Sequence, residues 1–213
     1  MRFELALLLP SLAAALPASG IMPFKRADTW GGAVSLGPTK STIVNAVTTF
    51  IPGAPPATQN GLLFLWPGMS NGTGDLVQTT VEQWNNGNSF GQLDGTASSI
   101  SGDTKVRIEY NLMSDGTTWE QKVTDASTGK SLSYFKHDSG PYMRGYGTGT
   151  ECDNSCTGTV SEQQYLGTTI TLASADTSFG NTIGSSQGAT YTGLKSSQGG
   201  KVWSIDKIHV PAM

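Results

Sequence analysis

Cysteine and histidine are scarce in this chain, which has two of each among its 213 residues. One Cys-x3-Cys spacing, with the histidines elsewhere at positions 137 and 209, does not supply the four ligands of a structural zinc site. Glycine-rich phosphate-binding motifs and clusters of metal ligands are also absent from the sequence. The sequence therefore predicts neither a bound metal nor a cofactor.

Charge is sparse as well. Charged residues make up 14% of the chain, the formal net charge is −3, and no run of basic residues occurs. Proteins that bind nucleic acid or an anionic membrane usually carry clustered Lys and Arg. We therefore expect neither of these partners.

The only long apolar stretch lies at the N-terminus, where Arg2 precedes a segment too short to span a bilayer that ends in small residues. We interpret residues 1–18 as a secretory signal and residues 19–26 as a short pro-segment ending in Lys25-Arg26, a pair of the kind that fungal processing proteases cut. Residues 27–213 then form a single domain. Removal of residues 1–26 takes away three of 13 basic and one of 16 acidic residues, which leaves a formal charge of −5. We expect a secreted, extracellular monomer.

A helical apolar period is absent from every window longer than about ten residues after the signal. Apolar and polar residues alternate instead, most clearly in residues 105–112 and 119–123, which a Ser-Asp-Gly turn joins as a hairpin. Many short strands at roughly ten-residue spacing are typical of an all-β, two-sheet antiparallel sandwich or jelly roll. Further strands are expected at 32–36, 43–51, 61–66, 75–84, 131–135, 160–165, 168–173 and 201–210.

Two short sequence patterns predict covalent modifications of a secreted chain. Cys152 and Cys156 most simply form one small disulfide loop with each other. Asn71 begins the sequon Asn-Gly-Thr in a turn-rich segment, where a surface glycan could be attached. We expect both modifications.

Gln78 is the most informative polar residue, because it interrupts a strand pattern in which Val or Ile would be usual. Alternation places Gln78 on the same strand face as Leu76 and Thr80, and Val77 and Val81 on the opposite, core-facing side. An amide on a half-exposed strand is common, so Gln78 gains meaning only from its surroundings. Aromatic residues that could line a groove beside it are Trp30, Trp66, Trp84 and Trp119.

Several segments resemble, in order, those of the fungal glutamic peptidases, the eqolisins. They are the DTWGGAV start (28–34), residues 43–52, Leu65-Trp66, the LVQT strand (76–79), Gly102-Asp103 and Ser127-Thr-Gly129. The resemblance runs in order over about two thirds of residues 27–213. The resemblance implies a concanavalin A-like sandwich and a secreted acid endopeptidase that acts on polypeptides.

The resemblance also implies roles for individual residues. Gln78 would polarise the scissile carbonyl and stabilise the oxyanion, and Trp30 and Trp66 would wall the cleft. A glutamate would act as general base, for which Glu162 is the best match and Glu82 the reserve. The family's glutamate strand carries two glutamates, of which Glu162 matches the first and Leu166 stands at the second. If the second glutamate is the catalytic one, this chain has lost it. The proposed substrate contacts are Trp30, Trp66, Glu82, Trp84 and Trp119.

Two other classes of function remain open. The first is a secreted module that binds protein or cell-wall glycan without catalysis. The second is a glycan-active enzyme, either a hydrolase with a carboxyl pair such as Glu109 and Glu120, or a lyase using Tyr134, His137 and Arg144. The decisive observation is whether Gln78 and a carboxylate meet on one face of a sheet.

Overall fold

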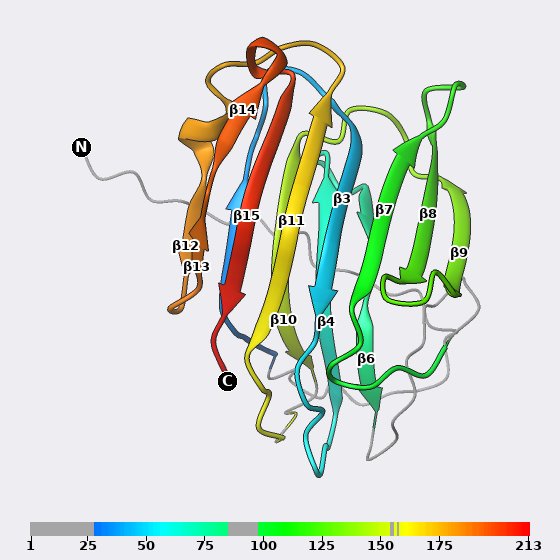
Figure 1. Cartoon of the computed structure of the whole chain (residues 1–213), viewed down its shortest axis with the longest axis vertical. Coiled ribbons are helices and arrows are strands. Elements are labelled where there is room, and N and C mark those ends of the chain that lie inside the picture. The colour runs from blue at the N-terminus through cyan, green and yellow to red at the C-terminus, as the bar shows by residue number, and fades with distance from the viewer. Residues whose placement is uncertain (1–27, 85–97, 154–155, 157) are drawn as a thin grey trace, which may run out of the picture.

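The computed structural model describes residues 28–84, 98–153, 156 and 158–213 (Figure 1). The signal and pro-segment expected at residues 1–26 therefore lie outside the described residues. Two antiparallel sheets pack face to face, and β10 and β4 run behind β11 and β3 in Figure 1. The predicted all-β sandwich is thereby confirmed.

The seven-stranded sheet, here called the A sheet, has the order β12-β2-β10-β4-β5, with β1 paired to β10 and β6 paired to β4. Its strands are β1 (Thr29–Trp30), β2 (Ala33–Leu36), β4 (Leu62–Ser70), β5 (Leu76–Gln78), β6 (Val81–Trp84), β10 (Gly145–Asp153) and β12 (Gly184–Ser186).

The eight-stranded sheet, here called the B sheet, has the order β13-β15-β11-β3-β7-β8-β9, with β14 paired to β15. Two short 3-10 helices, η1 (Phe179–Thr182) and η2 (Gln198–Gly200), accompany its connections. Its strands are β3 (Ile43–Ile51), β7 (Val106–Leu112), β8 (Thr118–Asp125), β9 (Ser131–Asp138), β11 (Gln163–Leu172), β13 (Thr190–Thr192), β14 (Lys195–Ser197) and β15 (Val202–Val210).

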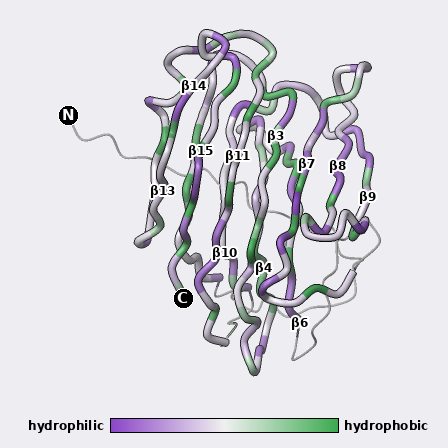
Figure 2. Tube along the Cα trace, viewed as in Figure 1, coloured by the Kyte–Doolittle hydropathy of each residue, from purple (hydrophilic) through white to green (hydrophobic). Residues whose placement is uncertain are grey.

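The hydrophobic core lies between the sheets because every second residue of the long strands points inward. Figure 2 shows hydrophobic and hydrophilic positions following one another along strands such as β15. The largest fully buried side chains come from both sheets, and Phe50 stacks on Tyr165 with ring centroids 4.6 Å apart. They include Trp119, Tyr110, Tyr165, Phe50, Met69 and Ile108.

The structure corrects some strand boundaries. The expected strands 160–165 and 168–173 form one strand, β11, whose pairing with β3 shifts register between Leu166 and Thr169. The expected strand 75–84 is divided into β5 and β6, which keep a common register on β4. β10 is absent from the sequence prediction, yet it lies at the centre of the A sheet. Among the described residues, no helix has the length and apolar character needed to cross a membrane.

Candidate functional site on the outer face of the A sheet

Gln78 ends β5 and faces away from the core, as alternation predicts. Its neighbours Val77 and Thr79 are buried at 0% and 5% exposure, while Gln78 itself is half-buried on the outer side. The Gln78 side chain makes no hydrogen bond to any residue in the described part of the chain. An amide that can donate two hydrogen bonds and accept others is therefore presented on the surface of the A sheet.

Two of the positions in line with Gln78 across the A sheet are glycines, of which Gly68 is buried and Gly147 is half-buried. Gln78 lies directly opposite Gly68 on β4, Gly68 lies opposite Gly147 on β10, and Gly147 lies opposite Ser35 on β2. Directly opposed residues share a face, so these four positions form a row across four strands. Glycine inside a strand often marks a place where a ligand or another backbone approaches closely. We call this row the glycine floor.

Trp66 borders the glycine floor along β4. Its indole lies across Gly149, where an added Cβ atom would stand 2.6 Å from a ring carbon. The Trp66 Nε1 atom is buried and has no hydrogen-bond partner in the part of the chain that the structure describes. A second unused donor therefore lies on the outer face of β4, where Trp66 is two residues from Gly68.

Contacts from the B sheet hold the β4–β5 region in place from below. Tyr110 donates a hydrogen bond of 2.8 Å to the Pro67 carbonyl, and Tyr165 donates one of 3.2 Å to the Trp66 carbonyl. Thr79 Oγ1 donates to Gln121 Oε1 at 3.2 Å. Burial raises the pKa of both tyrosines, so the hydroxyls stay protonated and remain donors. The strands β4 and β5, which carry Trp66 and Gln78, are thus fixed to the opposite sheet.

Carboxylates lie on the same face but at a distance from Gln78. Trp30, Glu151, Phe64 and Glu82 are directly opposed in that order across β1, β10, β4 and β6. Phe64 and Gly68 are four residues apart on β4, which separates this row from the glycine floor by about 13 Å at roughly 3.3 Å per residue. Glu82 is 3% exposed and accepts a hydrogen bond from Thr80 Oγ1.

Glu162 is not brought together with Gln78. It directly precedes β11 in the B sheet, its side chain is 62% exposed, and its Oε2 lies 3.1 Å from His209 Nε2 on β15. The chain leaves the A sheet after β10 and enters the B sheet at β11, so the two residues belong to different sheets. Leu166, which stands where the family has its second glutamate, lies on β11 of the B sheet.

The other predicted site residues are spread over the molecule. Trp30 is 36% exposed on the outer face of the A sheet, whereas Trp119 is fully buried in the core and its Nε1 donates to the Gly140 carbonyl at 3.0 Å. Trp84 is the last residue of β6 and pairs with Leu62. Burial thus removes Trp119 from any surface that a substrate could touch.

The two predicted modification sites lie near opposite ends of the A sheet strands. Cys152, near the end of β10, is bonded to Cys156, as predicted. Asn71 follows β4 in an exposed turn, where its Oδ1 accepts a hydrogen bond of 2.8 Å from the Thr73 amide. The disulfide anchors the chain where it leaves the A sheet.

The alternative groups for glycan chemistry are also separated. Tyr134 and His137 lie on opposite faces of β9 because they are three residues apart on one strand. Arg144 lies outside β9, and its Nε–H donates a hydrogen bond of 2.7 Å to the Thr39 carbonyl. Among the described residues, no three His, Cys, Asp or Glu side chains gather as a metal site would require.

The chain is similar in fold to solved structures of peptidases. SCP-B, a member of the Eqolisin family of peptidases solved with the tripeptide Ala-Ile-His, matches with a TM-score of 0.55 and 15% identity, over 88% of this chain and 100% of that chain. Scytalido-glutamic peptidase with a peptide-based transition state analog matches with a TM-score of 0.49 and 17% identity, over 85% and 98%. No protein-family model and no curated protein matches the chain. At 15% identity the likeness to SCP-B shows a shared fold, which is the fold that the sequence resemblance implied.

Proposed function

We propose that this chain is a secreted protein that binds extended polypeptide on the outer face of the A sheet. The observation that carries the proposal is Gln78, an amide without a partner among the described residues, beside the glycine floor. The absence of a side chain at the half-buried Gly147 lets a peptide main chain approach the sheet closely. Its carbonyl groups can then accept hydrogen bonds from the Gln78 amide, and Trp66 and Trp30 supply apolar contact. A peptide-bound eqolisin with the same fold supports this choice of ligand.

Binding is tested with an unfolded polypeptide, such as reduced and alkylated casein, by isothermal titration. Gln78→Ala should weaken the affinity about five- to tenfold, because one hydrogen-bonding group is lost. Gln164→Ala is the matched control, since Gln164 is also a half-buried glutamine on a strand but belongs to the B sheet. Equal affinity of wild type and Gln78→Ala would contradict the proposed site.

Peptide hydrolysis is the second candidate function. Gln78, Thr80 and Glu82 follow one another on the same strand face, and Thr80 orients the Glu82 carboxylate. In this candidate Glu82 acts as general base on a water molecule and returns the proton to the leaving nitrogen, while Gln78 stabilises the oxyanion. The separation of about 13 Å between the two rows is the main argument for binding over hydrolysis.

Hydrolysis is tested by incubating denatured protein with the mature chain between about pH 2 and 6, where carboxyl groups titrate. A catalytic pair predicts cleavage that Gln78→Ala reduces about 10²- to 10³-fold. Glu82→Gln should be at least as damaging because it removes the base, whereas Glu162→Gln should leave cleavage unchanged. If the wild type binds polypeptide but does not cleave it, hydrolysis is excluded and binding remains as the function.

Secretion and maturation form part of the same proposal. Cleavage after Arg26 would give a mature chain that begins at Ala27, two residues before β1. N-terminal sequencing of the secreted chain should find Ala27 first, and glycosidase treatment should lower its mass if Asn71 carries a glycan. An intact residue 1–26 segment in the medium would contradict the proposed processing.

A further inference from the structure

Among the strands of the described residues, Lys and Arg occur only in the B sheet. The A-sheet strands contain no Lys or Arg, within the ranges that the structure describes. The B-sheet strands contain five, and three of these come together on the adjacent strands β7, β8 and β9. The five are Arg107, Lys122, Lys136, Lys195 and Lys207.

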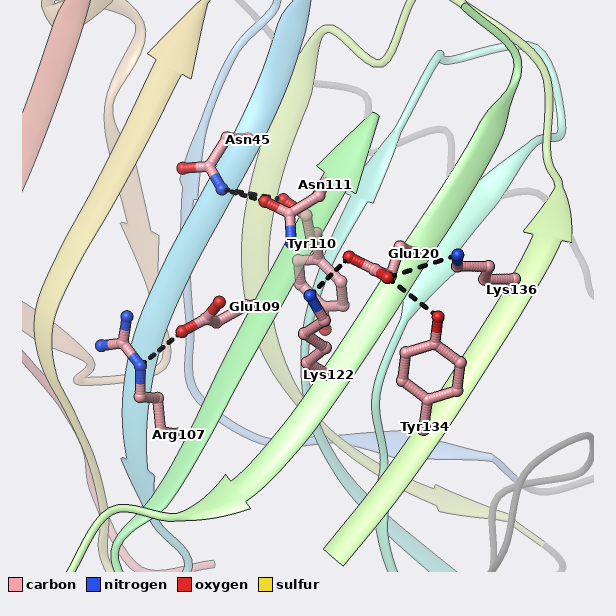
Figure 3. A network of polar contacts seen from close by, with 9 residues as sticks. All are labelled: Asn45, Arg107, Glu109, Tyr110, Asn111, Glu120, Lys122, Tyr134 and Lys136. Carbon is pink, nitrogen blue, oxygen red and sulfur yellow. Dashed lines mark hydrogen bonds and ion pairs between the residues drawn. The ribbon is translucent and has the colours of Figure 1, made fainter. Parts of the chain in front are cut away.

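Glu120 organises the charged cluster on β8 and β9 (Figure 3). Its carboxylate lies 2.8 Å from Lys122 Nζ and 3.5 Å from Lys136 Nζ, and it accepts a hydrogen bond of 2.9 Å from the Tyr134 hydroxyl. The hydrogen bonds from Lys122 and Tyr134 lower the pKa of Glu120 to about 2. One recessed carboxylate thus fixes two ammonium groups and a phenol in position over a wide pH range.

The cations protrude further from the sheet than the carboxylates. The side chains of Lys122, Lys136 and Arg107 are 47%, 41% and 44% exposed, whereas those of Glu120 and Glu109 are 12% and 28% exposed. A ligand that approaches this face therefore meets ammonium and guanidinium groups first. Exposed charges are complementary to a ligand with repeated negative charges.

The same face carries groups suited to a sugar. Tyr134 is 48% exposed, and Lys136 Nζ lies 5.7 Å from the centroid of its ring. Asn45 Nδ2 donates a hydrogen bond of 2.7 Å to Asn111 Oδ1. This bond orients the Asn111 amide, which lies directly opposite Glu120. An aromatic ring offers stacking to the apolar face of a pyranose, and oriented amides bond its hydroxyls.

We propose that the β7–β9 face of the B sheet binds an acidic polysaccharide, a polyuronate, through Lys122, Lys136 and Tyr134. The uronate carboxylates pair with the two ammonium groups, and a sugar ring stacks on Tyr134. This face lies on the opposite side of the sandwich from Gln78, so the proposal is independent of the proposed peptide site.

The experiment measures binding of the full mature chain to polygalacturonate by affinity electrophoresis or titration at low salt. Lys122→Gln and Lys136→Gln should each weaken binding about tenfold, as loss of a charged hydrogen bond does. Tyr134→Ala should weaken it similarly, whereas Tyr134→Phe retains the ring and most of the affinity. Lys195→Gln is the matched control, because Lys195 is an exposed, ion-paired lysine at the other edge of the same sheet.

Two further probes separate charge from sugar recognition. Fully methyl-esterified polygalacturonate retains the sugar rings without the charges and should bind at least tenfold more weakly. Polyglutamate retains the charges without sugar rings. Polyglutamate binding as tight as that of polygalacturonate, with Tyr134→Ala harmless, would overturn the glycan proposal in favour of a general anion surface. Lack of binding to polygalacturonate, or equal losses in Lys195→Gln and Lys122→Gln, would overturn it altogether.

Discussion

The two outer faces of this sandwich satisfy their polar groups in different ways. On the A sheet, Gln78 and the Trp66 Nε1 atom have no hydrogen-bond partner among the described residues. On the B sheet, the charged groups of β7–β9 are already bonded to one another around Glu120. Groups without a partner favour a ligand that forms hydrogen bonds with them. A paired network favours a ligand that is complementary to its exposed charges. The contrast points to different ligand chemistry on the two sides of one fold.

The largest effect should come from a tryptophan that belongs to neither outer face. Trp119→Ala should lower the free energy of unfolding by about 3–5 kcal/mol, because it empties a fully buried position. Trp30→Ala, on the exposed A-sheet face, should cost less than about 1 kcal/mol and weaken peptide binding instead. Denaturant unfolding of both variants measures the difference. Similar losses in stability would show that Trp30 is a structural residue.

Alanine substitutions at two glycines of the A sheet should distinguish the packed Trp66 contact from the glycine floor. Gly149→Ala should cost about 1–3 kcal/mol because its Cβ would stand 2.6 Å from the indole and force the ring to move. At Gly147 the nearest atom to an added Cβ is the Val34 carbonyl oxygen at 3.7 Å, so Gly147→Ala is the control and should leave stability almost unchanged. Equal unfolding midpoints would contradict the tight Trp66 packing.

Acid should remove the contribution of the B-sheet network. The folded-state pKa of Glu120, about 2, lies below its ordinary value of 4.5, so the stability it contributes is present above pH 4.5 and is lost as pH falls toward 2. Glu120→Gln should therefore be about 1 kcal/mol less stable than wild type near pH 6. Near pH 2 the two unfolding midpoints should converge. A constant difference across this range would contradict the ion-pair network.

The smallest effect is expected at the exposed pair Lys195–Asp206, which lies on the B sheet outside the β7–β9 network. The two side chains are 65% and 59% exposed at a distance of 2.8 Å. Lys195→Ala should change stability by less than about 0.5 kcal/mol, because water and salt screen exposed ion pairs. A larger loss in thermal unfolding would indicate that isolated pairs matter as much as the network.

The sequence predicts some elements well because their alternation is strong. Residues 43–51 form a strand with the predicted bounds, and Gln78 faces outward as expected. β10 escaped prediction because glycine alternates with Tyr146, Thr148 and Thr150, and glycine has low strand propensity. The regular spacing of those inward residues was the available signal, and it would also have placed Glu151 on the outer face.

The position of Glu162 could not be predicted from local pattern. Its place depends on the crossing from β10 in one sheet to β11 in the other, and that crossing follows the disulfide loop. Two strands that are neighbours in sequence can belong to the same sheet or to opposite sheets with the same alternation. Whether Gln78 meets a carboxylate is therefore a property of topology.

The buried tyrosines make the sandwich sensitive to alkali. Burial raises the pKa of Tyr110, Tyr146 and Tyr165, three of the six tyrosines, and the value for Tyr146 is about 12. Because these pKa values exceed the ordinary value of 10, the stabilising effect of the neutral phenols is complete below pH 10 and is lost as pH rises through the folded-state values. Ionisation of these phenols would also remove the Tyr110 and Tyr165 hydrogen bonds beneath Trp66 and Pro67. Tyrosinate absorbance should therefore rise in one cooperative step with unfolding. The pH of that step would report the separation of the two sheets.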